Sequence, residues 1–179
     1  MMPGMKTRHL IRTVSLLTLG LALAGCVTPP PVPSAPVDTT TPAQRMAAVE
    51  AAAGNDDKEL AVQPLRDAEV EDLRQAALVR RQSADLAAAA ATLDQALAIA
   101  STDPSVLQER AEIALLQGDW AKAETFARQS IELGSKTGPL CRRHWATIEQ
   151  ARLARGEKEN AASAHAQLEG CTVPGIMRY

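Results

Sequence analysis

The chain has 179 residues, of which 46% are hydrophobic and 2% aromatic. Its formal net charge is −2, and without the three basic residues near the N-terminus 16 basic side chains remain against 21 acidic ones. This balance argues against a nucleic-acid-binding protein, which needs a basic face. The abundance of alanine and the scarcity of aromatic residues favour close-packed helices over a sheet.

The first 25 residues have the pattern of an export signal. Lys6, Arg8 and Arg12 precede an apolar stretch, 16–24, that is too short to span a membrane permanently. The stretch ends in Leu23-Ala24-Gly25-Cys26, which resembles the lipobox of bacterial lipoproteins. The resemblance implies removal of residues 1–25 and attachment of a diacylglycerol and a further acyl chain to Cys26. The alternative is an ordinary signal peptide with a chance cysteine.

The lipid anchor also predicts a location. Two or three acyl chains hold a protein firmly to a bilayer, whereas one chain holds it marginally. Val27 follows Cys26, where an aspartate would resemble the inner-membrane retention signal of Gram-negative lipoproteins. The resemblance therefore implies a lipid anchor in the outer membrane and a protein that faces the periplasm.

Residues 26–43 are rich in proline, which disfavours both helix and sheet. We expect a polyproline-like tether that holds the folded part roughly 50 Å from the membrane. The alternative is a ligand for proline-recognising domains. After the tether, residues 44–64 predict a short helix, stopped by Gly54-Asn55, and a connector. This helix either packs on the first repeat or stays loose.

The following residues, 65–170, predict consecutive helices. Pro64 is typical of the first residue of a helix, which would continue to Arg81. Apolar residues at helical spacing, aspartates at the starts and glycines at the ends mark the later helices. Their expected ranges are 85–100, 104–117, 119–134, 138–155 and 157–169. Residues 171–179 form a C-terminal tail.

One turn pattern is repeated along these helices. Ala84-Asp85-Leu86 and Gly118-Asp119-Trp120 lie 34 residues apart, and a weaker copy follows at Gly156-Glu157-Lys158. A two-helix unit of this size cannot bury its apolar faces alone, so the units must stack. The sequence therefore predicts an all-α fold, a short α-solenoid of about three helical hairpins.

The repeated turns and their flanking apolar positions resemble those of tetratricopeptide-repeat proteins. The third copy departs from the pattern at its turn aromatic position, as a capping repeat would, and a bundle of unrelated helical hairpins is the alternative. The resemblance implies a groove lined by the first helix of each hairpin, which binds proteins or peptide segments. Six polar residues would face this groove or, alternatively, be ordinary solvated surface: Arg74, Arg81, Gln108, Glu112, Arg143 and Gln150.

The remaining cysteines flank the last predicted hairpin. Cys141 and Cys171 lie nearly equidistant from the turn at Gly156-Glu157, so they meet at its open end. Because exported compartments favour oxidation, we predict a disulfide between them, worth on the order of 3 kcal/mol. The alternative is a zinc site that adds His144 and His165, although the two histidines are about one turn out of register.

No catalytic motif, phosphate-binding loop or cofactor motif is found along the chain. We therefore expect a non-enzymatic interaction scaffold for envelope assembly, without cofactor, metal, nucleic acid or small-molecule substrate. Its partners would be envelope proteins or peptide segments, and the bilayer through Cys26. The alternatives are a pilotin-like assembly factor for a type IV pilus and an accessory subunit of a murein-acting enzyme.

Overall fold

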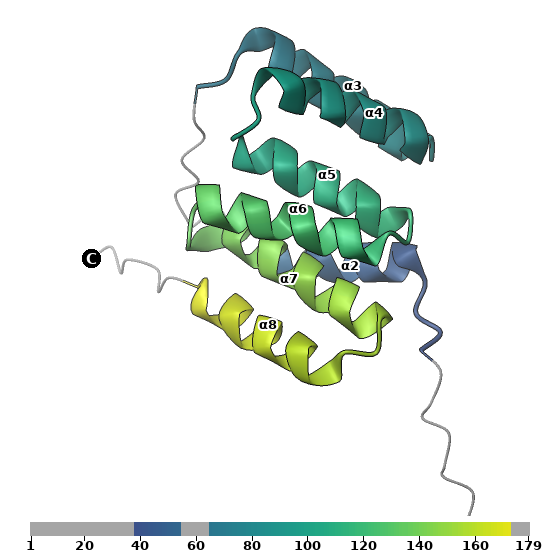
Figure 1. The fold of residues 1–179 in the computed structure, drawn as a ribbon, viewed down its shortest axis with the longest axis vertical. Coiled ribbons are helices and arrows are strands. Elements are labelled where there is room, and N and C mark those ends of the chain that lie inside the picture. Colours follow the sequence, from purple (N-terminus) through teal and green to yellow (C-terminus); the bar gives the residue numbers. More distant parts are fainter. Residues whose placement is uncertain (1–37, 55–64, 173–179) are drawn as a thin grey trace, which may run out of the picture. The chain divides into compact units, whose positions relative to one another are not determined.

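A computed structural model describes residues 38–54 and 65–172, which contain seven α-helices and no strand (Figure 1). The predicted all-α fold is therefore confirmed. The export signal, Cys26, most of the tether, the connector at 55–64 and most of the C-terminal tail lie outside the described residues. The helices are α2 (Pro42–Ala53), α3 (Ala68–Gln82), α4 (Leu86–Ile99), α5 (Pro104–Leu116), α6 (Trp120–Leu133), α7 (Gly138–Ala154) and α8 (Lys158–Gly170).

Six of these helices form a stack of three hairpins. Helix α3 packs on α4, α5 on α6 and α7 on α8, while α4–α5 and α6–α7 contacts join one hairpin to the next (Figure 1). The turns use left-handed backbone, with φ of 76° at both Gly118 and Gly156. The first turn places Ala84 there with φ of 61°, a conformation that costs a side-chain-bearing residue roughly 1 kcal/mol.

Aspartates define the starts of several helices. The Asp67 side chain accepts a hydrogen bond from the backbone amide of Glu69 at 2.8 Å and thereby caps α3. Helix α3 therefore begins at Ala68, and the predicted start at Pro64 is wrong. Asp85, Asp103 and Asp119 cap α4, α5 and α6 in the same way, which agrees with the predicted positions.

Small apolar side chains fill the space between the helices. One core cluster joins α3, α4 and α5 around Val70, Leu93 and Ile113. Another joins α5, α6, α7 and α8 around Ile148. The alanines between these residues allow helix axes to approach closely, so the helices pack with few large side chains. None of the helices in 38–54 and 65–172 has the length and apolar character that crossing a membrane requires.

Helix α2 lies against α7 and α5 rather than on the first hairpin (Figure 1). Met46 and Val49 are buried in a cluster with Leu115 and Ala146. The expectation that this helix packs on the first repeat or stays loose is therefore wrong. Its apolar face packs on α5 and α7, and its hydrogen bonds to α7 join residues 89 and 105 positions apart.

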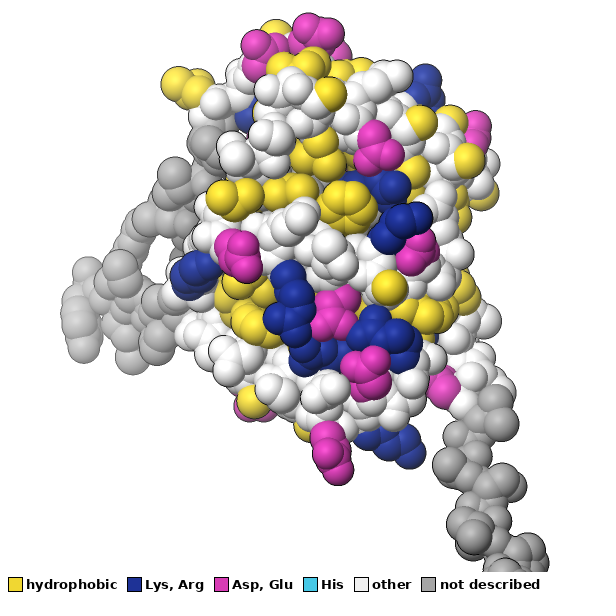
Figure 2. All heavy atoms as spheres, viewed as in Figure 1, with side chains coloured by type: hydrophobic (Ala, Val, Ile, Leu, Met, Phe, Trp, Pro, Cys, Tyr) yellow, Lys and Arg dark blue, Asp and Glu magenta, His cyan; other side chains and the backbone are white. Residues whose placement is uncertain are grey.

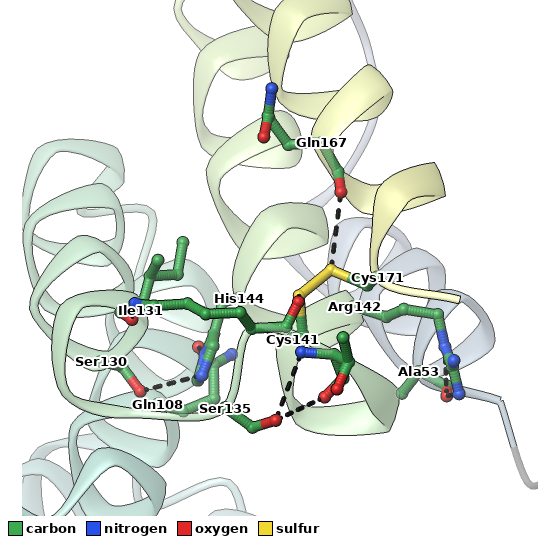
Figure 3. The surroundings of a disulfide bond; sticks show 12 residues. Ala53, Gln108, Ser130, Ile131, Ser135, Cys141, Arg142, His144, Gln167 and Cys171 are labelled. Carbon is green, nitrogen blue, oxygen red and sulfur yellow. Dashed lines mark hydrogen bonds between the residues drawn. A yellow bond between two sulfur atoms is a disulfide. The ribbon is translucent and has the colours of Figure 1, made fainter. Parts of the chain in front are cut away.

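A disulfide joins Cys141, in the first turn of α7, to Cys171, directly after α8 (Figure 3). Their Cα atoms are 5.7 Å apart, and 30 residues separate them in sequence. Beside the disulfide the Gly138 amide donates to the Cys171 carbonyl at 2.8 Å. Covalent and hydrogen bonds thus hold the open end of the last hairpin, where the sequence predicts the two cysteines to meet.

Candidate partner-binding groove

The six predicted groove residues lie on the first helices of the three hairpins. Arg74 and Arg81 are on α3, Gln108 and Glu112 on α5, and Arg143 and Gln150 on α7. The structure links most of them to one another or to α2 by hydrogen bonds. We define the candidate groove as the side of α3, α5 and α7 that carries these residues, with α2 lying over its α5–α7 part.

Glu112 is the centre of this groove. Its carboxylate, 1% exposed, accepts hydrogen bonds from Arg143 Nε at 2.8 Å and Nη2 at 2.6 Å. Arg81 Nη1 approaches the same carboxylate at 3.3 Å. Although burial disfavours the charge on Arg143, the Glu112 carboxylate raises the pKa of this guanidinium. A bidentate pair of this kind fixes geometry strongly, so Glu112 aligns α3, α5 and α7.

Gln108 extends the same network below the surface. Its side-chain amide donates to Glu112 at 3.0 Å and to Thr147 Oγ1 at 2.9 Å. Its carbonyl oxygen accepts from His144 Nδ1 at 2.7 Å. Gln108 and Glu112 are both buried, so in this conformation they join α5 to α7 and do not present free polar groups to a partner.

Two groove residues contact α2 directly. Gln150 accepts hydrogen bonds from Arg45 Nη1, at 3.3 Å to its side-chain oxygen and 3.2 Å to its backbone carbonyl. Arg81 pairs with Glu50 of α2 in addition to Glu112. Arg45 and Glu50 cannot be identified as groove contacts from the sequence, because nothing local to residues 42–53 shows which helices they meet.

The part of the groove on α3 remains open. Arg74 pairs with Glu109 of α5 and with Glu71. Leu78 lies four residues after Arg74 and three before Arg81, so the three side chains share one face of the helix. Leu78 is 44% exposed. An exposed leucine between two guanidiniums is the accessible element of this surface.

A serine, a histidine and a glutamine meet in the interior with the order of a catalytic triad. Ser130 Oγ lies 3.2 Å from His144 Nε2, and Gln108 binds the other ring nitrogen (Figure 3). Burial, with smaller effects of Lys136 and Arg143, lowers the pKa of His144 to about 3. Ser130 and His144 have no exposed surface, so no substrate reaches this serine and the contacts are structural.

The residues of the alternative zinc site do not converge. Cys141 and Cys171 are joined to each other, and His144 is bound to Gln108 and Ser130. His165 lies on the surface, 3.2 Å from Glu149, whose carboxylate raises the pKa of this imidazole. Within 38–54 and 65–172, no three metal-binding side chains gather around a common point.

A separate ion network joins α6 to the last hairpin. Glu124 accepts hydrogen bonds from Arg152 at 3.0 and 2.9 Å and also pairs with Arg128 and Arg155. Burial alone would raise the pKa of Glu124, but the hydrogen bonds from the three arginines lower it to about 2. Figure 2 shows basic and acidic side chains gathered together on the face of the stack that it presents.

The chain matches a solved structure, the globular C-terminal domain of P. aeruginosa LpoP. The TM-score is 0.56 and the sequence identity 34%, and the match covers 59% of this chain and 99% of that chain. The chain belongs to the family of this LpoP domain. No family model matches the chain, and no curated protein matches it. The resemblance of this LpoP-like domain to tetratricopeptide repeats therefore remains a prediction from its turns.

Proposed function

We propose that this protein is a lipid-anchored protein of the cell envelope whose LpoP-like domain binds another envelope protein and catalyses no reaction itself. The observation that carries the proposal is the match to the LpoP domain at 34% identity over 99% of that domain. The disulfide adds support, because such bonds persist in oxidising compartments.

We place the anchor at Cys26 in the outer membrane, with the domain in the periplasm. This part of the proposal depends on Leu23-Ala24-Gly25-Cys26 and on Val27. Because α2 begins at Pro42 rather than at residue 44 as expected, residues 26–41 would act as the tether between membrane and domain, and residues 65–170 as the binding unit. A tether of this length lets the domain meet partners roughly 50 Å from the bilayer.

An enzyme that synthesises peptidoglycan is the partner class that we propose, as one kind of the murein-acting enzymes among the alternatives from the sequence. The accessible binding surface is the α3 side of the candidate groove. Leu78 would enter an apolar pocket of the partner, and the ion pairs that Arg74 and Arg81 make beside it would lie at the edge of that pocket. Apolar anchors surrounded by charged residues are typical of specific interfaces.

The proposal is tested by photo-crosslinking in living cells. A crosslinking residue is placed at Leu78, and a control residue at Gln129, which is exposed on α6. We expect the Leu78 probe to capture a peptidoglycan synthase that the Gln129 probe does not. Addition of the purified protein should then change the rate of the captured synthase.

Three outcomes would overturn parts of this proposal. Capture of nothing at Leu78, with the fold intact, would exclude the α3 surface. Capture of a pilus component would favour the pilotin-like alternative. A captured synthase whose rate is unchanged by the purified protein would leave a scaffold without a regulatory role.

A further inference from the structure

Helix α2 occupies the candidate groove as a bound ligand would. Of its residues Met46, Val49 and Ala53 are buried against the rest of the domain, while the neighbouring Ala47 and Ala48 are exposed. The spacing of these buried residues, three and four apart, presents one apolar face to α5 and α7. This is the mode by which amphipathic helices bind apolar grooves in other proteins.

The groove also contacts the backbone of α2 at its C-terminal end. Arg142 donates to the carbonyl oxygen of Ala53 from Nε at 3.1 Å and from Nη2 at 2.8 Å (Figure 3). The last carbonyls of a helix have no partner within the helix, and a cation there also suits the helix dipole. Arg142 therefore recognises a helix end, independently of the side chains that the helix carries.

Arg45 makes the contacts near the other end. It donates to Gln150 at 3.2 and 3.3 Å, and its guanidinium lies 5.7 Å from the centre of the Trp120 ring. Its Nε is buried without a hydrogen-bond partner among the described residues. A buried donor without a partner costs free energy, so the docked state of α2 is held less tightly than its contacts suggest.

The connection of α2 to the rest of the domain differs from that of the other helices. Tight turns of a few residues join the helices of each hairpin, whereas residues 54–67 separate α2 from α3. A helix joined in this way binds its groove as an intramolecular ligand, whose occupancy depends on its affinity and its effective concentration.

We infer that the α5–α7 part of the groove is a helix-binding site that α2 occupies at rest and that a helix of the partner takes over. This inference rests on the proposed function, since it needs a protein partner. The partner helix would copy the chemistry of α2, with an arginine followed by apolar residues one, four and eight positions later. The apparent affinity of the partner helix is proportional to the fraction of molecules in which α2 is undocked, so docking of α2 weakens its binding.

The test compares two matched aspartate variants. Val49→Asp places a carboxylate at a position with no exposed surface, whereas Ala48→Asp places it on the solvent side of the same helix. We expect amides of α2 in V49D to exchange with solvent at least about tenfold faster than in A48D, with α5 and α7 unchanged. The probe is a labelled peptide of residues 41–54. We expect it to bind V49D saturably and to bind A48D at least about tenfold more weakly.

A further variant and a competition experiment keep the test decisive. V49D/R142Q should bind the peptide more weakly than V49D, since the helix end loses its cap. If V49D unfolds the domain, excess peptide is added to the unaltered protein, and we expect exchange of its α2 amides to accelerate. Release of α2 without peptide binding, or excess peptide without effect on α2, would overturn the inference.

Two other outcomes separate this inference from the proposed function. The Leu78 crosslink to a peptidoglycan synthase should increase in V49D, because the groove is vacant. An unchanged crosslink would overturn the inference and leave the function standing. Peptide binding without any captured protein would leave the helix-binding site standing, but would overturn the proposed function and the role of a partner helix. A dimer in which copies exchange α2, detected by its mass, would identify the occupant as a second copy and overturn the role of a partner helix.

Discussion

The second helices of the first and last hairpins, α4 and α8, are held in the stack by different contacts. Helix α4 buries five residues, Ala89, Ala90, Thr92, Leu93 and Ala96, whereas α8 buries two, Ala161 and Ala164. The last hairpin instead has the disulfide, the Glu124 ion network and the cover that α2 places on α7. Burial of apolar side chains thus holds α4 in the stack, whereas α8 depends more on the disulfide at its end and on the ion network at its turn.

The difference shows how a helix with little apolar surface is kept in a repeat stack. Full burial of one leucine contributes about 1.5 to 3 kcal/mol. Closing a loop of this length with a disulfide contributes about 3 to 4 kcal/mol in chain-entropy terms. The disulfide therefore replaces one or two large buried side chains, and α8 can remain mostly polar on its outer face.

Of the changes that test this difference between α4 and α8, removal of the disulfide should have the largest effect on the free energy of unfolding. The double variant C141S/C171S should lower the free energy of unfolding by about 3 kcal/mol, because the unfolded chain regains its freedom. Hydrogen exchange should accelerate in α8 and remain unchanged in α3 and α4. Equal acceleration in both hairpins would show that the stack unfolds as one unit and that the two ends are not stabilised separately.

The ion network should give an intermediate effect that depends on pH. The pKa of Glu124 falls from 4.5 in the unfolded chain to about 2 in the folded protein. Its contribution is therefore complete above pH 4.5 and is lost as the pH falls through about 2. We expect Glu124→Gln to cost about 1 kcal/mol at pH 7, because solvent screens these partly exposed pairs.

The control for this prediction is Glu132→Gln, which changes an exposed carboxylate on the same helix. Denaturant unfolding of both variants and the unaltered protein is measured between pH 7 and pH 2. The difference between E124Q and the unaltered protein should shrink with falling pH, while E132Q follows the unaltered protein throughout. A constant difference would mean that the contribution of Glu124 to stability does not depend on its charge.

The smallest effect is expected at the turn of the first hairpin. Ala84→Gly should raise the free energy of unfolding by up to about 1 kcal/mol, because glycine adopts the left-handed backbone without a side-chain clash. Gly118→Ala at the corresponding turn should lower it by a similar amount. A destabilised A84G, measured by its denaturation midpoint, would show that the freedom gained by the unfolded chain outweighs the relieved strain.

Local signals in the sequence were sufficient for the hairpins. Each turn carries an acidic residue after a left-handed position, and aspartate caps act within three residues of themselves. The meeting of Cys141 with Cys171 follows from equal distances to one turn. The start of α3 differs from the predicted one because the side-chain cap of Asp67, and not the proline at position 64, determines where the helix begins.

The location of α2 and the state of the groove could not be predicted in this way. Met46 and Val49 mark an apolar face, but the same face would suit any hairpin of the stack. Gln108 and Glu112 have the side chains of surface residues but are both buried. Arginines from α3 and α7 reach Glu112, and Thr147 and His144 of α7 bind Gln108. Such networks depend on residues more than 30 positions apart, which periodicity does not relate to one another.

The sequence distance between α2 and its groove sets an order of events during folding. Arg142 and Ala53 are 89 residues apart, and Arg45 and Gln150 are 105 apart. Hairpins made of neighbouring helices form quickly, whereas contacts that close long loops form late. Helix α2 is therefore made first and docks last, after α7 has reached its place. A newly made molecule passes through a period in which the hairpins are complete and the α5–α7 groove is still vacant.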